Sequence, residues 1–251
     1  MERIFVIPCR YSDKTPFIYR CLDSIRKYYD DKIVIFDSNS DDKSYFDIIK
    51  NDYTNVEIIE GNKNYMTGAI WKSYDKFEVN YYYYLHDSTE LIDSLLQYEK
   101  YSVSPILKSS SWKWPVWPSK SDGTRTSVWA EKELKKTDIE FKKNGFDSII
   151  GPMFIINRNV LDELKRLNFN KILPTQKSEM EMMERIWGLA FNQIGIEFKE
   201  NVVLKNKSGS SGPLQEVILK NKKNNKELAV PVKMATRDID DSIIKYWSGR
   251  L

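Results

Sequence analysis

The first ninety residues alternate between short apolar runs and amphipathic segments, and this alternation constrains the fold more than any other feature. Four apolar runs are typical of buried strands, at residues 3–8, 32–36, 56–60 and 81–85. Apolar residues at three- and four-residue spacing predict helices between these runs, at 17–29, 45–50 and 66–77. Strands that alternate with helices form a parallel sheet with right-handed crossovers. The sequence therefore predicts an α/β fold whose central sheet is mostly parallel and flanked by helices.

The rest of the chain has a less regular pattern. It predicts a strand at 148–157 that is interrupted at Gly151 and Pro152, followed by helices at 160–167 and 178–194. After residue 202 the pattern weakens, and we expect a hairpin that pairs 217–219 with 228–232. A short helix is expected at 240–247.

Composition excludes several classes of protein. The 251 residues carry a net charge of only +3, which argues against a dedicated nucleic-acid binder. The two cysteines, Cys9 and Cys21, lie in apolar patterns, so we expect core residues in a reducing compartment and no cysteine-based metal site. Without a signal-peptide pattern or an apolar run that could span a membrane, we expect a cytoplasmic protein. Contact with a membrane surface and the oligomeric state stay open.

Ligands of such sheets bind at the carboxyl ends of the strands. Two candidate residues lie there, after the first and second predicted strands: Arg10 suits a base carbonyl or a phosphate, and Asp37 suits a base amide or a ribose hydroxyl. The alternative for Asp37 is an ordinary helix cap or turn residue.

The fourth predicted strand ends in His86, Asp87 and Ser88. A polar, acidic cluster at a strand end can hold a divalent cation against a diphosphate. His86 is the only histidine of the chain, so a site with several histidines is excluded, and a purely structural histidine is the alternative.

The predicted helix at 178–194 carries two candidate general bases. Glu184 borders the apolar face that includes Met183 and Trp187, where a carboxylate can have a raised pKa. Glu181 lies one turn before Arg185, and its alternatives are a capping box with Ser178 or a surface ion pair with Arg185.

Tryptophans gather in the middle of the chain, at Trp112, Trp114, Trp117 and Trp129. Aromatic faces stack on sugar rings, so this segment is a candidate acceptor site, and Trp112, Trp114 and Trp117 are its candidate residues. A satellite core or a partner surface explains the same residues equally well.

Taken in order, these segments resemble glycosyltransferases of the GT-A fold. The resemblance covers residues 3–91 and 149–196, through I-P-C-R-Y, F-D-S-N-S-D, M-T-G-A-I, L-H-D-S-T-E-L, G-P-M-F-I-I-N-R and S-E-M-E-M-M-E-R-I-W-G-L-A-F. In that family L-H-D-S-T-E-L corresponds to the metal-chelating DxD motif, but His86 and Ser88 stand here where aspartates are usual.

The resemblance implies a single Rossmann-like domain at 1–200, with a nucleotide-binding half at 1–91, an acceptor-binding half at 92–200 and a C-terminal extension at 201–251 that packs on the site or closes over it. It implies transfer of a sugar from a nucleoside-diphosphate sugar to a hydroxyl of a carbohydrate acceptor. The implied reaction inverts the anomeric configuration and uses Glu184 or Glu181 as the general base. The implied donor-binding residues are Pro8, Arg10, Asp37, Ser38, Gly68, His86 and Asp87. The implied ligands of Mn²⁺ or Mg²⁺ are Asp87, His86 and Ser88.

Three points stay open at this level. Lys233, Arg237 and Lys245 are candidates to close over the diphosphate. A non-catalytic carbohydrate- or nucleotide-binding protein would explain the altered triplet. A nucleotidyltransferase is disfavoured because Pro8-Cys9-Arg10-Tyr11 follows the first strand in place of a glycine-rich loop.

Overall fold

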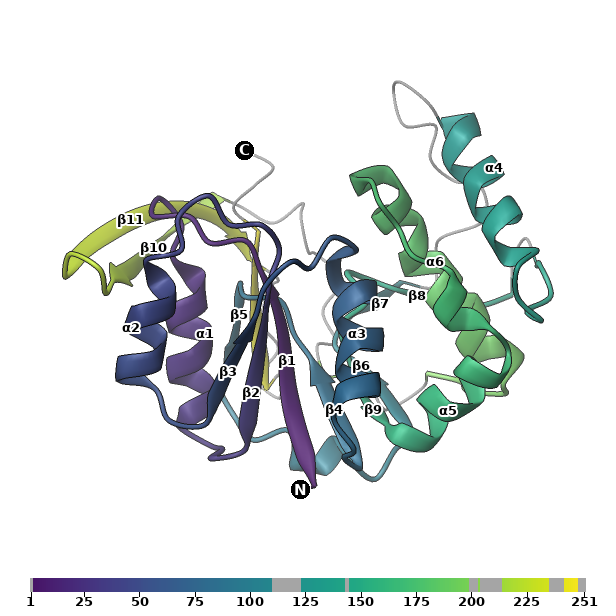
Figure 1. Cartoon of the computed structure of the whole chain (residues 1–251), viewed down its shortest axis with the longest axis horizontal. Helices are drawn as coiled ribbons and strands as arrows, with labels where there is room; N and C mark the ends of the chain where they lie inside the picture. The colour runs from purple at the N-terminus through teal and green to yellow at the C-terminus, as the bar shows by residue number, and fades with distance from the viewer. Residues whose placement is uncertain are drawn as a thin grey trace.

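The computed structural model describes residues 2–109, 123–142, 145–198, 203, 214–234 and 242–247. Within these residues, six strands form a central sheet in the order β3-β2-β1-β4-β9-β6 (Figure 1). They are β1 (Arg3–Cys9), β2 (Lys32–Asp37), β3 (Val56–Ile59), β4 (Tyr81–Tyr84), β6 (Val103–Pro105) and β9 (Phe154–Asn157). β1 is parallel to β2 and β4, and β2 is parallel to β3, whereas β9 is antiparallel to β4 and β6. The predicted α/β class and mostly parallel sheet are confirmed.

Three helices connect the parallel strands, and they cover both faces of this half of the sheet. α1 and α2 lie on one side and α3 on the other (Figure 1). Their bounds are Phe17–Arg26, Tyr45–Asp52 and Tyr65–Lys76. Because both faces are covered, the side chains of Ile4, Phe5, Val6 and Ile7 in β1 are all fully buried. This is the burial that a continuous apolar run predicts.

The chain after β4 contributes shorter strands, three more α-helices and two 3₁₀-helices, η1 and η2. The further elements are η1 (Leu96–Tyr98), β7 (Lys108–Ser109), α4 (Gly123–Leu134), β8 (Ser148–Ile149), α5 (Arg158–Arg166), η2 (Phe169–Lys171) and α6 (Lys177–Gln193). The strand expected at 148–157 is two strands, because Gly151 between them has a φ of +65° and turns the chain out of the sheet. None of the helices in the described ranges is both long enough and apolar enough to cross a membrane.

Helix α6 is held against the sheet by an aromatic cluster around Trp187. The Trp187 ring is fully buried, with its centroid 4.6 Å from that of Phe169 and 5.1 Å from that of Phe154. At the next residue, a Cβ on Gly188 would lie 1.8 Å from the backbone oxygen of Asp147. The helix therefore approaches β8 so closely that only glycine fits, and its position relative to the sheet is fixed.

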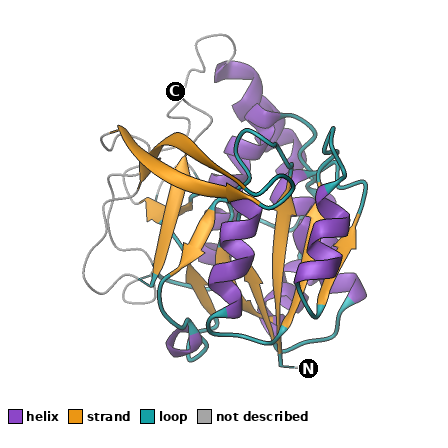
Figure 2. Cartoon of the chain, turned by 90° about the vertical axis from the view of Figure 1, so that its left-hand side faces the viewer, coloured by secondary structure: helices purple, strands orange, loops and turns teal. Residues whose placement is uncertain are grey.

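A second sheet joins the C-terminal segment to β5 in the N-terminal part of the chain. Its order is β10-β11-β12-β5, and its strands are β5 (Thr89–Leu91), β10 (Leu214–Asn221), β11 (Lys226–Met234) and β12 (Ile243–Trp247). The expected hairpin is confirmed as β10 and β11, and Figure 2 shows its long curved ribbon crossing above the neighbouring helices.

The prediction of a helix at 240–247 is wrong, because Ile243–Trp247 forms the strand β12. β-branched Ile243 and aromatic Tyr246 favour extended backbone. Both side chains are buried, and the strand pairs antiparallel with β5 on one side and β11 on the other.

Candidate functional site

The topological switch point of the sheet lies between β1 and β4. From β1 the chain continues to β2 and β3 on one side, whereas β4 is added on the other side. At the carboxyl end of this pair the backbone N–H of Leu85 donates to the oxygen of Val6, at 3.1 Å. Cys9 is the last residue of β1, Arg10 follows it, and the triplet His86-Asp87-Ser88 follows Leu85. Open α/β sheets bind ligands at such a point, so the candidate site is built here.

Asp87 is half-buried and lies against the end of β1. Burial raises the pKa of its carboxyl, whereas the charge of Lys245 and hydrogen bonding from the Cys9 thiol lower it. Asp87 in turn raises the pKa of the Cys9 thiol, which burial has already raised. The carboxylate is thus held between the ends of two parallel strands and a lysine from a distant part of the chain.

That lysine, Lys245, comes from β12 and is only 4% exposed. It lies opposite Thr89 in the β5–β12 pairing, and its ammonium donates a hydrogen bond to Oγ of Ser88. Burial lowers the pKa of Lys245 to about 8, and the charge of Asp87 opposes this shift. Of the three C-terminal cations named from the sequence, this one reaches the triplet. Lys233 lies in β11 opposite Trp247, and Arg237 lies outside the described residues.

His86 and Glu184 meet at Gly151. The backbone N–H of Gly151 donates to Oε1 of Glu184 at 2.9 Å, and a Cβ at this glycine would lie 2.9 Å from Cε1 of His86. Burial lowers the pKa of His86 to about 3, the charge of Lys245 lowers it further, and a hydrogen bond with the Gly151 backbone opposes both. A neutral imidazole therefore packs against the turn that positions the Glu184 carboxylate. The structure thereby joins the predicted nucleotide-binding half to the predicted acceptor-binding half.

Glu181 lies one turn before Glu184 on α6. Its backbone oxygen accepts a hydrogen bond from Nη1 of Arg185 at 3.1 Å. Burial lowers the pKa of Arg185, whereas the charges of Glu184 and Glu181 raise it, so both carboxylates act on this one buried guanidinium.

The capping box suggested from Ser178 to Glu181 is wrong. The box is formed by Gln176 and Glu179, because the helix begins earlier than expected, at Lys177. Glu181 therefore does not cap its own helix.

The end of β2 is closed by internal hydrogen bonds. The Asp37 side chain is 1% exposed and accepts hydrogen bonds from the Tyr45 hydroxyl at 2.9 Å and from the Ser40 backbone N–H at 3.2 Å. Oγ of Ser38 accepts one from Nδ2 of Asn62 at 3.1 Å. Asp37 therefore has the turn-forming contacts that were its alternative interpretation, and its side chain is buried.

The other predicted donor-binding residues lie around this edge. Pro8 is half-buried near the end of β1, and the exposed Arg10 places its guanidinium 3.5 Å from the Asp41 carboxylate. A Cβ on Gly68 would lie 2.8 Å from Oδ1 of Asn62, so this glycine lets α3 pack against the loop after β3.

The predicted acceptor residues Trp112, Trp114 and Trp117 lie outside the described residues. Trp129 lies in α4 and packs, partly buried, against the main core. For this one tryptophan the observed contact is with the main core and not with a separate satellite core.

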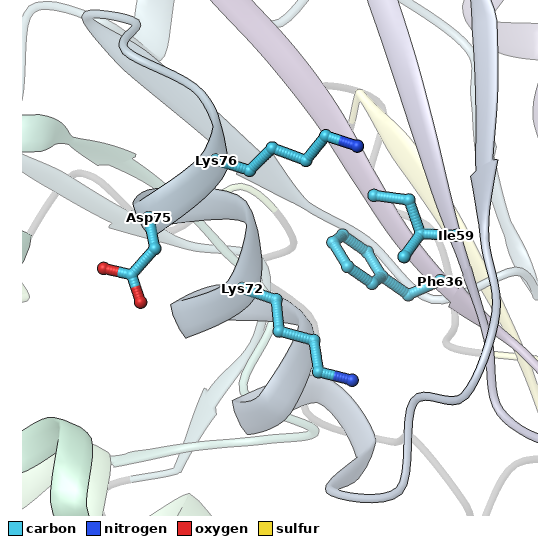
Figure 3. Close-up of a pocket in the computed structure, with 5 residues that line it drawn as sticks. All are labelled: Phe36, Ile59, Lys72, Asp75 and Lys76. Carbon is cyan, nitrogen blue, oxygen red and sulfur yellow. The ribbon is translucent and has the colours of Figure 1, made fainter.

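A shallow pocket beside β2, β3 and α3 was not expected from the sequence. It has a volume of about 380 Å³, and Phe36, Ile59, Lys72, Asp75 and Lys76 line it. Figure 3 shows the two lysine side chains reaching from α3 toward Phe36 and Ile59, while Asp75 points away from them. The lysines already have partners, since Lys72 donates to the oxygen of Gly61 at 3.1 Å and Lys76 pairs with Glu57. In the sequence, the only sign of this pocket is the spacing of Lys72 and Lys76, which lie one helical turn apart.

The donor set of the triplet does not fit a divalent cation. Asp87 is its only carboxylate, an ammonium acts on that carboxylate, and the Ser88 hydroxyl accepts from the same ammonium. Across the described ranges, no group of three or more histidine, cysteine, aspartate or glutamate side chains is arranged to hold a metal ion. Mn²⁺ and Mg²⁺ prefer several oxygen ligands, which this arrangement does not supply.

No family model matches the sequence, and no curated protein matches it. Among solved structures, the chain is similar to residues 1–349 of S. aureus TarS, with a TM-score of 0.44 and 14% identity over 75% of this chain and 56% of that chain. The same protein in complex with UDP gives a TM-score of 0.43 and 14% identity, over 72% of this chain and 53% of that chain. The structure of GalNAc-T7 with UDP, GalNAc and Mn²⁺ gives a TM-score of 0.47 and 18% identity, over 74% of this chain and 40% of that chain. The chain thus spans little more than half of the TarS chains and less than half of the GalNAc-T7 chain.

Proposed function

We propose that this chain is a glycosyltransferase that moves a sugar from a nucleoside-diphosphate sugar to a hydroxyl of a carbohydrate acceptor. The observation that carries the proposal is the meeting of His86 and Glu184 at Gly151, which puts a candidate base beside the switch point of the sheet. The sequence resemblance to the GT-A fold supports the same assignment.

In this proposal the diphosphate lies at the carboxyl ends of β1 and β4, near Asp87, and Arg10 lies where a base or phosphate would bind. Asp37 and Ser38 act by holding the loop after β2, because Asp37 accepts hydrogen bonds from Ser40 and Tyr45. No step passes through a divalent metal, since the donor set at the triplet does not fit one.

The chemical step needs one carboxylate base. Glu184, or Glu181 one turn earlier, removes the proton of the acceptor hydroxyl, and the oxygen attacks the anomeric carbon. The bond between that carbon and the diphosphate oxygen breaks, and the nucleoside diphosphate leaves with the electron pair. A single displacement of this kind inverts the anomeric configuration. Glu184 is our first choice because it bonds the turn that contacts His86.

The test is a panel of UDP-, GDP- and CDP-sugars, with thermal shift and sugar-nucleotide hydrolysis as readouts. We expect at least one donor to stabilise the protein and to be hydrolysed. Glu184→Gln should lower turnover by 10²-fold or more, about the contribution of a general base, while donor binding persists. Glu163→Gln, which changes an exposed carboxylate on α5, is the matched control.

Two results would contradict the proposal. Absence of stabilisation by every nucleotide would remove the donor site. Binding without turnover, unchanged in Glu184→Gln and Glu181→Gln, would favour a non-catalytic binding protein.

A further inference from the structure

We propose that the Lys245 ammonium supplies the positive charge at the diphosphate subsite, so that nucleotide binding does not depend on a divalent metal. This inference rests on the proposed function, because it assumes that a nucleoside diphosphate binds at the switch point. It concerns a residue more than 150 positions away from the triplet in the sequence.

The first support is the position of Lys245. It is the one buried lysine in the part of the chain that the structure describes. The pairing of β12 with β5 places it beside the triplet, since Lys245 lies opposite Thr89 and the N–H of Tyr246 donates to the oxygen of Ser88 at 3.0 Å. Two bonds from β12 therefore reach Ser88, one from the backbone and one from the ammonium.

The second support is that β12 is anchored independently of the lysine. The Tyr246 hydroxyl donates to Oε2 of Glu90, and Nε of Arg20 bonds the same carboxylate oxygen at 2.7 Å. The Tyr246 ring stacks on Phe17 with the ring centroids 5.4 Å apart. Elements α1, β5 and β12 are thus tied around Glu90, and this network would hold the strand in place if Lys245 were replaced.

The third support is the balance of charge. A lone Asp87 at the diphosphate site would repel the negative phosphates, but the ammonium that acts on it offsets that charge. Lysine is a common phosphate ligand because its ammonium is a compact point charge with three N–H donors. A divalent cation would have to bind beside that ammonium, which like-charge repulsion opposes. The arrangement therefore favours a phosphate as the ligand.

The experiment measures binding of UDP, GDP and CDP, and of the matching nucleosides, by titration calorimetry. Wild-type protein is titrated in EDTA and in Mn²⁺, and Lys245→Met and Lys245→Arg are titrated in EDTA. Lys220→Met, which changes an exposed lysine of β10, is the matched control. We expect the best nucleoside diphosphate to bind wild-type protein equally well, within about twofold, in EDTA and in Mn²⁺.

Lys245→Met should weaken the diphosphate by about tenfold or more, as expected when a charged partner is lost, and leave nucleoside binding unchanged. Lys245→Arg should retain part of the affinity. A merely structural lysine would instead lower the affinity for nucleoside and diphosphate together.

The outcomes separate the two proposals. Diphosphate binding that EDTA abolishes, or that Lys245→Met leaves unchanged, overturns the role of Lys245 and keeps the proposed function. No binding by any nucleotide overturns both. The EDTA comparison uses wild-type protein, so a requirement for metal would overturn the proposal even where Lys245→Met does not fold, and Lys245→Arg then tests the lysine itself.

Discussion

Gly151 is the residue at which the two halves of the candidate site meet. Its φ of +65° is readily available only to glycine, its N–H bonds Glu184, and its missing side chain leaves room for the His86 ring. One small residue therefore forms a backbone turn and brings two polar side chains to the same point of the chain. Asp37 differs from Gly151, because its carboxylate accepts hydrogen bonds from the loop after β2 and from the first residue of α2.

The variant Gly151→Ala tests whether this glycine is needed where His86 and Glu184 come together. An alanine in the left-handed region costs about 1–2 kcal/mol, and here its Cβ would also press on His86. We expect a lower midpoint of urea unfolding and a loss of donor hydrolysis. Gly195→Ala is the control, because it has a similar φ of +76° with no atom within 4 Å of the new Cβ. Equal effects of the two variants on hydrolysis would show that the contact with His86 is unimportant.

Among the elements, the buried parallel strands and their helices could be predicted from sequence, because each is encoded by its own apolar pattern. β12 could not, because Ile243–Trp247 becomes a strand only through its partners β5 and β11. β5 itself, Thr89–Leu91, is too short to give a pattern. The candidate site was likewise predictable only in part. The triplet can be recognised from sequence because it follows a strand, whereas the contact of Lys245 with the triplet depends on long-range strand pairing.

Helix α6 gives the prediction at this scale. Gly188→Ala would place a Cβ 1.8 Å from the Asp147 oxygen, so the helix must move away from β8 or the chain must unfold. Overpacking against a backbone atom should cost about 3 kcal/mol or more. Chemical denaturation followed by circular dichroism measures the loss, and the Gly195→Ala variant beyond the end of the same helix should lose much less. A stable Gly188→Ala protein with wild-type turnover would mean that the position of Glu184 does not depend on this contact.

For the whole molecule, two kinds of side-chain contact add to the β5–β12 pairing in holding the β10–β11 hairpin to the N-terminal part of the chain. One is an apolar cluster, consisting of Phe17, Val217, Leu219, Val230, Val232 and Tyr246. The other is a set of ion pairs at the hairpin tip, where Lys223 lies 2.7 Å from the Asp42 carboxylate and 3.3 Å from that of Asp13. Exposed ion pairs contribute little, so the apolar cluster should dominate.

Two variants compare these contacts. Leu219 is 1% exposed, and Leu219→Ala should cost about 2–5 kcal/mol through the cavity that it leaves. Lys223→Ala should cost less than about 1 kcal/mol, because its ion pairs are at the surface. Urea unfolding at low and high salt measures both. A larger loss for Lys223→Ala would show that the hairpin is attached mainly by charge.

The pairing of β5 with β12 also has a consequence for how the protein reaches its native state. Ser88 and Lys245 are 157 residues apart, so the loop that their contact closes spans most of the chain. Contacts of such long range form late, because the entropy of closing the loop must be overcome first. During synthesis, β1 to β4 can assemble while Asp87 still lacks its cation and β5 still exposes an unpaired edge. The nascent N-terminal segment should therefore be prone to self-association until β12 arrives, and the pairing of that strand brings Lys245 to the candidate site and protects the edge of β5 in one event.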